Sequence, residues 1–295
     1  MNRRLFSLQE IAAEVGDPSR PVDLAAAEVG IMLARFSEIG LPNAPLRPTM
    51  ARLRSAALEG RSRLLFDKFG RVAAYANWTD GGESSCSVVG DAVVFHGYVF
   101  ETLAYFKDWA PLEFHYVRTY RSRRVLRAIA KQNLERRHGL PDTQASLGIF
   151  NPSMVVMRES VKGILMAGER LSSLVDTLAA GAGGEHSTVG ATVVRLSKAM
   201  SLDQCRQFES GGFVTWAWMA QDDVLANPVP PHAWCAGPCL RIVDSEIPSA
   251  SVDECVEFVR RKVEGTRSPG NSLVYVDVRG STVAVPTNSL RLAWS

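Results

Sequence analysis

The stretch "RLLFDKFGRVAAYANW", residues 63–78, has the pattern of a β-hairpin. Two runs rich in apolar and aromatic residues flank the sequence Asp67-Lys68-Phe69-Gly70. A glycine at the end of such a turn can take the positive φ that reversal of the chain requires. We therefore expect two antiparallel strands here, and we place the neighbouring segments relative to this hairpin.

Helical patterns precede the hairpin. Residues 23–38 place four apolar side chains on one helical face, and residues 49–59 have helical spacing as well. Ser7 followed by Glu10 is the signature of a capping box at the start of a helix. The four apolar residues of the first face are Val29, Met32, Leu33 and Phe36.

A strongly basic segment follows the hairpin, after an apolar run at residues 92–106. Residues 117–137 carry seven Arg and one Lys against one Glu. Because Gly139 and Pro141 stand just beyond this segment, we expect it to form one long basic helix that ends there.

Composition indicates a globular protein, and the mixture of helical and strand patterns along the chain predicts an α/β (α+β) fold. The chain has 295 residues, which suits one large domain or two of ordinary size, and 46% of them are hydrophobic. The net charge is only +2, and no known nucleic-acid motif is present. A nucleic-acid binder acting through residues 117–137 is therefore the weaker interpretation.

The cysteines predict a reduced, cytoplasmic protein. Cys235 and Cys239 have only His232 nearby, so a zinc site would lack a ligand, and we expect no metal and no redox cofactor. The start of the chain has no apolar core long enough for a signal peptide, and no stretch is apolar enough for a membrane span. The remaining cysteines are Cys86, Cys205 and Cys255.

The second half of the chain repeats the order of the first. Three segments recur at offsets that fall from 160 to 141 to 136 residues. These matches predict a tandem repeat. The matched segments are "VGIMLARFSE" (29–38) with "VGATVVRLSK" (189–198), "GRVAAYANW" (70–78) with "GGFVTWAWM" (211–219), and "LAYFKDWAP" (103–111) with "CLRIVDSEIP" (239–248).

The repeat predicts two domains. The first spans residues 1–150 and the second residues 189–295. Residues 151–188 join them as a helical connection that ends in the Gly- and Ala-rich linker at 178–190.

Two motifs resemble those of the RTX toxin-activating lysine acyltransferases. Ala74, Tyr75 and Trp78 are similar to the "PVAYCSWA" strand of that family. The family also has an aromatic-Asp-Trp-x-Ala-Pro segment, and residues 106–111 resemble it with one residue fewer between Trp109 and Ala110. The resemblance covers residues 28–137 and, more faintly, residues 189–280.

The resemblance implies two tandem domains of the GNAT-like acyltransferase fold. Each would be a mixed, mostly antiparallel sheet flanked by helices, with central strands that splay apart to admit the pantetheine arm of an acyl donor. Members of the family move a fatty acyl group from acyl carrier protein to lysine side chains of a toxin.

The resemblance makes Asp108 the expected catalytic carboxylate. A lysine ammonium must lose a proton before it attacks a thioester, and a partly desolvated carboxylate can assist as a base. In the family this Asp acts with a His in an S-P-x-H motif, which this sequence lacks. His115 and His96 are the candidate substitutes. The alternative interpretations are a turn-capping Asp before Pro111 and hydrogen-bonded structural histidines.

Arginines of the basic segment are the candidate donor-binding residues. Arg pairs with phosphate through its planar fork, and the start of a helix adds N–H donors. The segment lacks a Gly-rich pyrophosphate motif, so docking of an acidic acyl carrier protein fits as well as CoA, and a solvated basic face is the alternative. The candidates are Arg118, Arg121, Arg123 and Arg124, with Trp109 beside the donor.

Tyr75 and Trp78 are candidates for lining an acyl channel, although strand aromatics are usually core residues. Asp244 stands in the second copy where Asp108 is matched, but without the aromatic neighbours. We therefore expect an active first domain and a second domain that serves as a pseudo-subunit.

The sequence predicts an N-acyltransferase. It would move a medium or long acyl group from acyl carrier protein or acyl-CoA to a lysine or ornithine side chain of a peptide or protein. It resembles most the GNAT-like maturases that attach fatty acids to ribosomally made peptides. The alternative is a catalytically inactive relative that binds an acyl carrier or a peptide. Association of two chains into a homodimer is left open.

Overall fold

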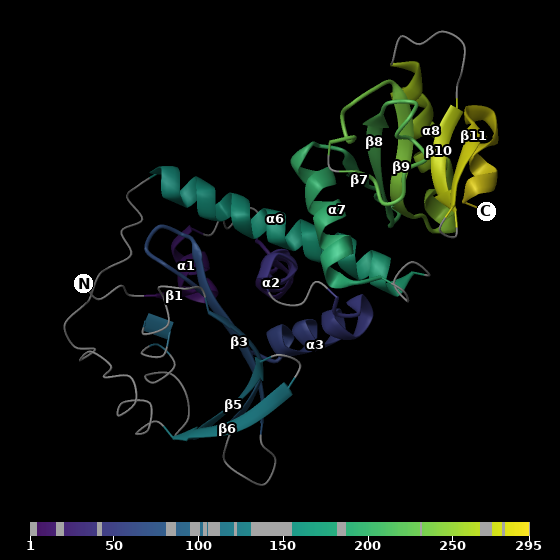
Figure 1. Ribbon diagram of the computed structural model, residues 1–295. Helices are drawn as coiled ribbons and strands as arrows, with labels where there is room; N and C mark the ends of the chain where they lie inside the picture. Colours follow the sequence, from purple (N-terminus) through teal and green to yellow (C-terminus); the bar gives the residue numbers. More distant parts are fainter. Residues whose placement is uncertain are drawn as a thin grey trace. The chain divides into compact units, whose positions relative to one another are not determined.

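The computed structural model describes most of the chain in two compact units (Figure 1). The first unit comprises Met1–Ala44 and Pro48–Ser173, and the second comprises Pro45–Arg47 and Leu174–Ser295. The division lies inside a helix, upstream of the domain start predicted at residue 189. The described residues are 5–15, 21–39, 43–80, 87–94, 101–102, 105, 113–120, 123–130, 155–181, 187–230, 232–265, 273–278 and 281–294.

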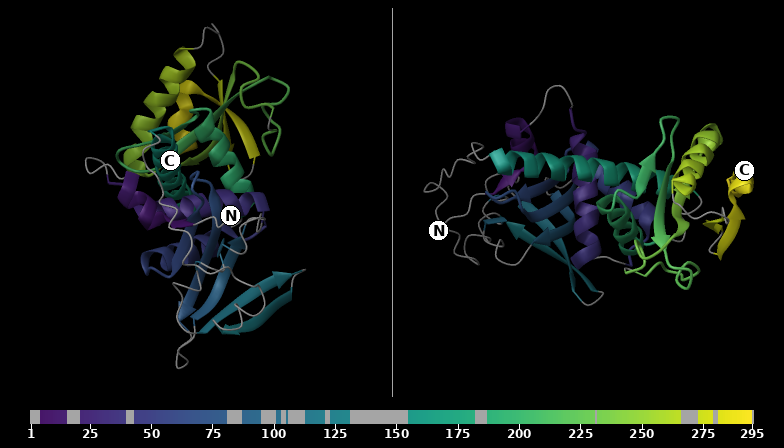
Figure 2. Two further views of the ribbon diagram at one scale, coloured as in Figure 1. Left: turned by 90° about the vertical axis from the view of Figure 1, so that its left-hand side faces the viewer. Right: turned by 90° about the horizontal axis from the view of Figure 1, so that it is seen from above.

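The first unit contains a six-stranded mixed sheet in the order β1-β2-β3-β4-β5-β6, and Figure 2 shows its twist. All neighbouring strands are antiparallel except β4 and β5, which are parallel. The strands are β1 (Phe6–Ser7), β2 (Ser62–Phe66), β3 (Val72–Asp80), β4 (Ser87–Val94), β5 (Glu113–Tyr120) and β6 (Arg123–Ala130).

The hairpin predicted from residues 63–78 is confirmed as β2 and β3. Leu64 faces Tyr75 across the pair, and Gly70 has φ 73° at the end of the turn. The buried carboxylate of Asp67 holds the turn, because its Oδ1 accepts hydrogen bonds from the N–H groups of Phe69 and Arg71, each at 2.9 Å.

The helices predicted before the hairpin are confirmed. They are α1 (Leu8–Val15), α2 (Leu24–Ile39) and α3 (Leu46–Leu58). The capping box is formed as expected: the N–H of Ser7 donates to the Glu10 carboxylate at 2.6 Å, and the N–H of Glu10 donates to Ser7 Oγ at 3.2 Å. Val29, Met32 and Leu33 of α2 are buried.

The long basic helix predicted for residues 117–137 is wrong over the part that the structure describes. Residues 113–120 and 123–130 are the antiparallel strands β5 and β6. The segment "EFHYVRTY" is rich in aromatic and β-branched residues, which favour a pleated strand. Pairing with β4 then outweighs the helical propensity of the Arg, Ala and Leu residues that follow. Residues 131–137 lie outside the described residues.

A helix crossing in the first unit depends on two glycines. Helix α6 (Val155–Ala180) crosses α2 where Gly30 meets Gly168. A Cβ on Gly30 would lie 1.8 Å from the carbonyl oxygen of Gly168, and a Cβ on Gly168 would lie 2.7 Å from that of Ala27. The two backbones therefore touch at a distance that no side chain permits.

This crossing yields a stability prediction with an internal control. Gly168→Ala should lower the free energy of unfolding by about 1–3 kcal/mol, because the methyl group overpacks the contact. Gly163→Ala, in the same helix with nothing within 4 Å of the added Cβ, should raise it by about 0.5–1 kcal/mol. Urea unfolding of both variants measures the difference. Equal effects would show that the two helices do not meet at Gly168.

The second unit contains a five-stranded mixed sheet in the order β11-β10-β9-β8-β7. Helix α8 packs on one face of this sheet over a core that includes Trp216, Leu240, Ile242 and Val276. The elements are α7 (Val189–Ser201), β7 (Cys205–Gln207), β8 (Phe213–Met219), β9 (Cys239–Glu246), η3 (Ser249–Ser251), α8 (Val252–Glu264), β10 (Leu273–Val278), β11 (Ser281–Pro286) and η4 (Thr287–Ala293).

The two sheets share one topology. In each, a helix leads into three antiparallel strands, and a helical connection leads into a fourth strand that is parallel to the third. A fifth strand then pairs antiparallel with the fourth at the edge of the sheet. Strands β2, β3, β4, β5 and β6 thus correspond to β7, β8, β9, β10 and β11. In the first unit, the described helical residues of the connection are 101–102 and 105.

Strand registers make the equivalence residue by residue. In both sheets the pairing of the second strand with the third shifts by one residue, between Ala76 and Trp78 and between Thr215 and Trp216. Beyond the shift, Trp78 faces Val89 and Trp216 faces Ile242. Trp78 and Trp216 are therefore equivalent.

The same registers align β4 with β9. Because Val89 and Ile242 are equivalent, Asp91 is equivalent to Asp244 and Cys86 to Cys239. The predicted match of residues 239–248 with residues 103–111 is wrong, since β9 corresponds to β4. The first-half counterpart of Asp244 is thus Asp91, and not Asp108.

The helical match is also corrected. Helix α7 stands directly before β7 as α3 stands directly before β2, so residues 189–198 do not correspond to residues 29–38. The segments "TMARLRSA" (49–56) and "TVVRLSKA" (192–199) share Thr, Arg, Leu and Ala at one spacing. The match of residues 70–78 with residues 211–219 identified the right strands, but its alignment is wrong by three residues. It made Tyr75 the equivalent of Trp216, whereas the registers make Trp78 the equivalent.

Candidate functional site

In each sheet, the ladder between the two central parallel strands ends where the first of these strands, β4 or β9, bulges. In the first sheet, the described ladder of β4 and β5 joins Ser87–Val89 to Phe114–Tyr116. In the second sheet, the ladder of β9 and β10 joins Leu240–Ile242 to Val274–Val276. Strands β4 and β9 both continue beyond these pairs. Each sheet therefore has an opening between its two central strands, just past the bulge.

The bulge changes which face of the second sheet the later residues of β9 point to. Leu240 and Ile242 face α8 and belong to its core. A bulge places one extra residue on one strand, so the alternation of side chains shifts by one position. Asp244 consequently reaches Arg195 of α7, while Ser245 bonds to Trp294 of the α8-facing cluster.

Asp244 is held in an ion pair at the bulge. Arg195 Nη2 donates to its Oδ1 at 2.8 Å, and Thr215 Oγ1 accepts from the N–H of Asp244 at 3.0 Å. Burial disfavours the charged guanidinium of Arg195, but Asp244 and Asp277 outweigh this effect and raise its pKa. The Asp244 side chain is 7% exposed and fully engaged, so its role is to fasten α7 to the sheet.

The first half carries the same residue types at two of the three equivalent positions. Arg52 of α3 is the counterpart of Arg195, and Asp91 of β4 is the counterpart of Asp244. Asn77 stands where the second sheet has Thr215. Sequence reasoning missed Asp91, although "Cys-x-x-x-x-Asp" occurs in both halves and was a usable signal.

Breaking the Arg195 pair tests its structural role. Arg195→Gln should lower the free energy of unfolding by about 3 kcal/mol, because it leaves a buried carboxylate without its cation. Arg261→Gln is the matched control. It removes an i,i+4 pair with Glu257 whose Arg side chain is 75% exposed, and it should cost less than about 0.5 kcal/mol. Chemical unfolding of both variants measures the effect. A similar loss in the two would contradict the assignment.

The opening of the second sheet is covered by the end of the chain. Leu290 of η4 is fully buried, and Trp294 Nε1 donates to Ser245 Oγ at 3.2 Å, past the last pair of β9 with β10. The first turn of the nearby helix α8 holds Asp253 and Glu254. Each of these carboxylates is paired with an arginine, Asp253 with Arg291 and Glu254 with Arg206, both at 3.4 Å. The second opening is therefore covered by protein side chains.

Two of the three predicted catalytic residues, Asp108 and His96, lie outside the described residues. The predicted donor-binding residues Trp109 and Arg121 lie outside them as well. His115 lies on β5, in register with Val88 of β4. It therefore stands in the central parallel ladder, next to the opening of the first sheet.

The predicted donor-binding arginines lie on strands and not on a helix. Arg118 is on β5, and Arg123 and Arg124 are on β6. These three arginines therefore do not form a phosphate site at the start of a helix.

Tyr75 and Trp78 are core residues. They are 2% and 6% exposed. The hydroxyl of Tyr75 accepts from Asn77 Nδ2 at 3.2 Å, whereas Trp78 packs in a cluster that Tyr105 covers. Being three positions apart on one strand, they lie on opposite faces of the sheet. A channel along one face would meet only one of them.

A buried carboxylate in the first unit was not found from the sequence. Glu28 of α2 is 3% exposed and accepts a hydrogen bond from the hydroxyl of Ser62 on β2. Burial raises the pKa of Glu28, and the Ser62 hydrogen bond and the charge of Arg63 oppose part of that increase. Its burial favours a role in joining α2 to the sheet over contact with a substrate.

Glu28 predicts a pH dependence of stability. Because its pKa is higher in the folded chain than in the unfolded chain, protonation favours folding, and this contribution is lost as the pH rises through the raised pKa. Glu28→Gln keeps an acceptor for Ser62 without the charge. The variant should be more stable than the parent at pH 7, and the gap should close as the pH falls toward 4. Unfolding curves across this range measure it, and a constant gap would refute the prediction.

The described residues show neither a metal cluster nor a membrane-spanning helix. No group of three or more His, Cys, Asp or Glu in the described part of the chain could hold a metal ion. None of the helices there combines the length and the apolar character that crossing a bilayer requires.

Comparisons with known proteins found no relative. No family model matches the chain, and neither the curated proteins nor the solved structures yielded a match.

Proposed function

We propose that the protein is a GNAT-like N-acyltransferase that moves a fatty acyl group from a thioester donor to a side-chain amine of a peptide or protein. The observation that carries this proposal is the opening past the bulge in the central parallel pair of each sheet. Such an opening suits the thin pantetheine arm of an acyl donor, because unpaired backbone groups on both strands can bind its amides.

The first unit is the proposed active half. In the second unit, Trp294 and Leu290 cover the region of the opening. Asp244 is also tied to Arg195 and is not available as a base. These features support a pseudo-subunit role for the second unit.

The proposed chemistry is acyl transfer to a neutral amine. The amine nitrogen of a lysine or ornithine attacks the thioester carbonyl, a C–N bond forms, the C–S bond breaks, and the thiolate leaves and takes up a proton. Asp108 is the proposed base by resemblance, with His115 or His96 as its partner. Among these, His115 has a described position beside the central ladder.

Acyl carrier protein is the favoured donor over CoA. Arg118, Arg123 and Arg124 lie near one end of the β5–β6 hairpin, and none of them stands at the start of a helix. Arginines on a strand pair suit the acidic surface of a carrier protein, which offers many carboxylates.

A non-catalytic binder is the second candidate. The sequence lacks the histidine of the family motif, and one of the two openings is covered by the chain itself. Such a protein would hold an acyl carrier or a peptide without turnover.

Donor discharge tests the proposal. Acyl carrier protein and CoA thioesters of several chain lengths are mixed with the protein and a peptide containing lysine and ornithine, and intact masses are read. We expect the peptide to gain one acyl group, and Asp108→Ala to reduce the rate at least about 100-fold, as loss of a general base does. The matched control is Asp222→Ala, an exposed Asp of the second unit that should leave the rate unchanged.

The outcomes separate the candidates. Thioester binding without discharge by the parent protein would favour the non-catalytic binder. Discharge that persists in Asp108→Ala would keep the acyltransferase and remove Asp108 from its mechanism.

A further inference from the structure

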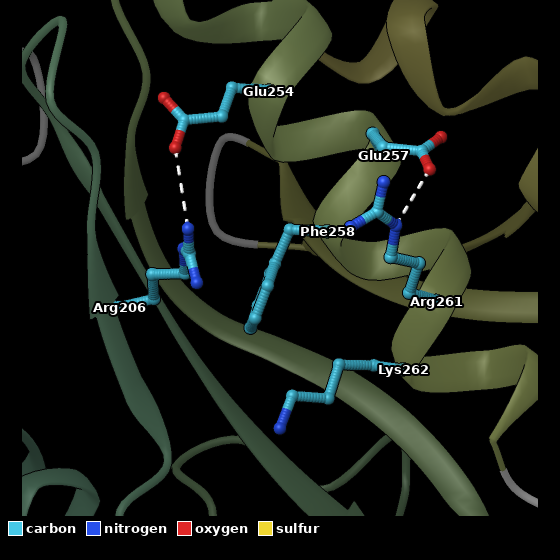
Figure 3. Close-up of a pocket in the computed structure, with 6 residues that line it drawn as sticks. All are labelled: Arg206, Glu254, Glu257, Phe258, Arg261 and Lys262. Carbon is cyan, nitrogen blue, oxygen red and sulfur yellow. Dashed lines mark hydrogen bonds and ion pairs between the residues drawn. The ribbon is translucent and has the colours of Figure 1, made fainter.

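A hollow in the second unit lies between strand β7 and helix α8 (Figure 3). Its volume is about 420 Å³. Small-molecule sites have volumes of roughly 300–1,000 Å³, so the hollow is large enough for an organic ligand. The lining residues are Arg206, Glu254, Glu257, Phe258, Arg261 and Lys262.

The charges of the hollow leave one cation without a carboxylate. Arg261 pairs with Glu257 at 2.8 Å, and Arg206 pairs with Glu254 at 3.4 Å across the hollow. Among the described residues, no carboxylate forms an ion pair with Lys262. The lining therefore carries a net charge of about +1, centred on Lys262.

Aromatic rings hold the cations in place. The Lys262 ammonium lies 4.8 Å from the ring centre of Trp216 and 5.5 Å from that of Phe258. The Arg206 guanidinium lies 5.0 Å from the ring centre of Phe258. Both distances to Phe258 are within the range of cation–π attraction. Two cations from two different elements thus lie within cation–π distance of the ring of Phe258, and a bound anion would offset part of their mutual repulsion.

The rim limits the charge of that anion. Glu254 and Glu257 lie on α8 one turn apart, and they would repel the several charges of a pyrophosphate or a nucleotide. A single carboxylate meets Lys262 and Arg206 without that penalty. The ring of Phe258 then offers an apolar surface to the remainder of the ligand.

We propose that this hollow binds a singly charged organic carboxylate, whose charge lies between Lys262 and Arg206 and whose apolar body lies against Phe258. The carboxylate can belong to a free acid or to the C-terminus of a peptide, and the chemistry of recognition is the same. This site is independent of the proposed acyl transfer, since none of its residues takes part in that reaction.

Calorimetric titration of the full chain tests the site. The probes are 3-phenylpropionate and decanoate as free acids, N-acetylphenylalanine as a peptide end, its amide as the uncharged match, and pyrophosphate. We expect the carboxylates to bind, and the amide and pyrophosphate to bind at least about tenfold more weakly. The amide has no charge for Lys262 and Arg206, and pyrophosphate has several charges that Glu254 and Glu257 repel. Tighter binding of N-acetylphenylalanine than of both free acids would identify a peptide end as the natural source.

Variants locate the binding. Lys262→Gln should weaken carboxylate binding about tenfold or more, whereas Lys198→Gln, the same change on α7, should have no effect. Glu254→Gln should strengthen binding, because it frees Arg206 from its carboxylate. A ligand in place should also protect Lys262, and not Lys198, from amine acetylation read peptide by peptide. Absence of binding at millimolar concentration, equal loss in the two lysine variants, or preference for pyrophosphate would each overturn the proposal.

Discussion

One extra residue in β9 organises the second unit, and the register of β4 repeats it in the first. It ends the parallel ladder to the neighbouring strand, and it sends Asp244 to the face of α7 while Ser245 goes to the face of α8. Without the bulge, Asp244 would point into the apolar core around Ile242, where an unpaired carboxylate is costly. The ion pair with Arg195 and the opening of the sheet therefore have one common cause.

Local patterns were predictable from the sequence. The Asp67 turn depends on hydrogen bonds within a few residues, and the capping box of Ser7 and Glu10 on a spacing of three. Strand β5 was missed because its pairing with β4 is a long-range interaction, and β6 was missed with it because β6 pairs with β5. The composition of residues 117–137 alone favours a helix. The secondary-structure propensity of a short segment contains no information about a partner strand far away in the sequence.

The candidate site was predictable only in part. The repeat was detected, but the strand registers correct its alignment. The shared "VG" of residues 29–30 and 189–190 drew the match away from the pair of Arg52 with Arg195. Asp91 follows from strand register, which no single-sequence pattern contains. The lysine of the hollow was not found, because Lys262 and Arg206 are far apart in the sequence and line one hollow only through the packing of α8 on the sheet.

Helix α6 crosses the division between the units without interruption. Its residues up to Ser173 belong to the first unit, and those from Leu174 to Ala180 to the second. Seven residues are too few to stay helical by themselves. The end of this helix is nevertheless bound within the second unit, since Arg47 Nε donates to the carbonyl of Ala179 at 2.7 Å. The backbone hydrogen bonds around residue 173 thus belong to one helix that contributes residues to both units. Dividing the chain at either predicted domain boundary, after residue 150 or after residue 188, would therefore separate one unit from residues that belong to it.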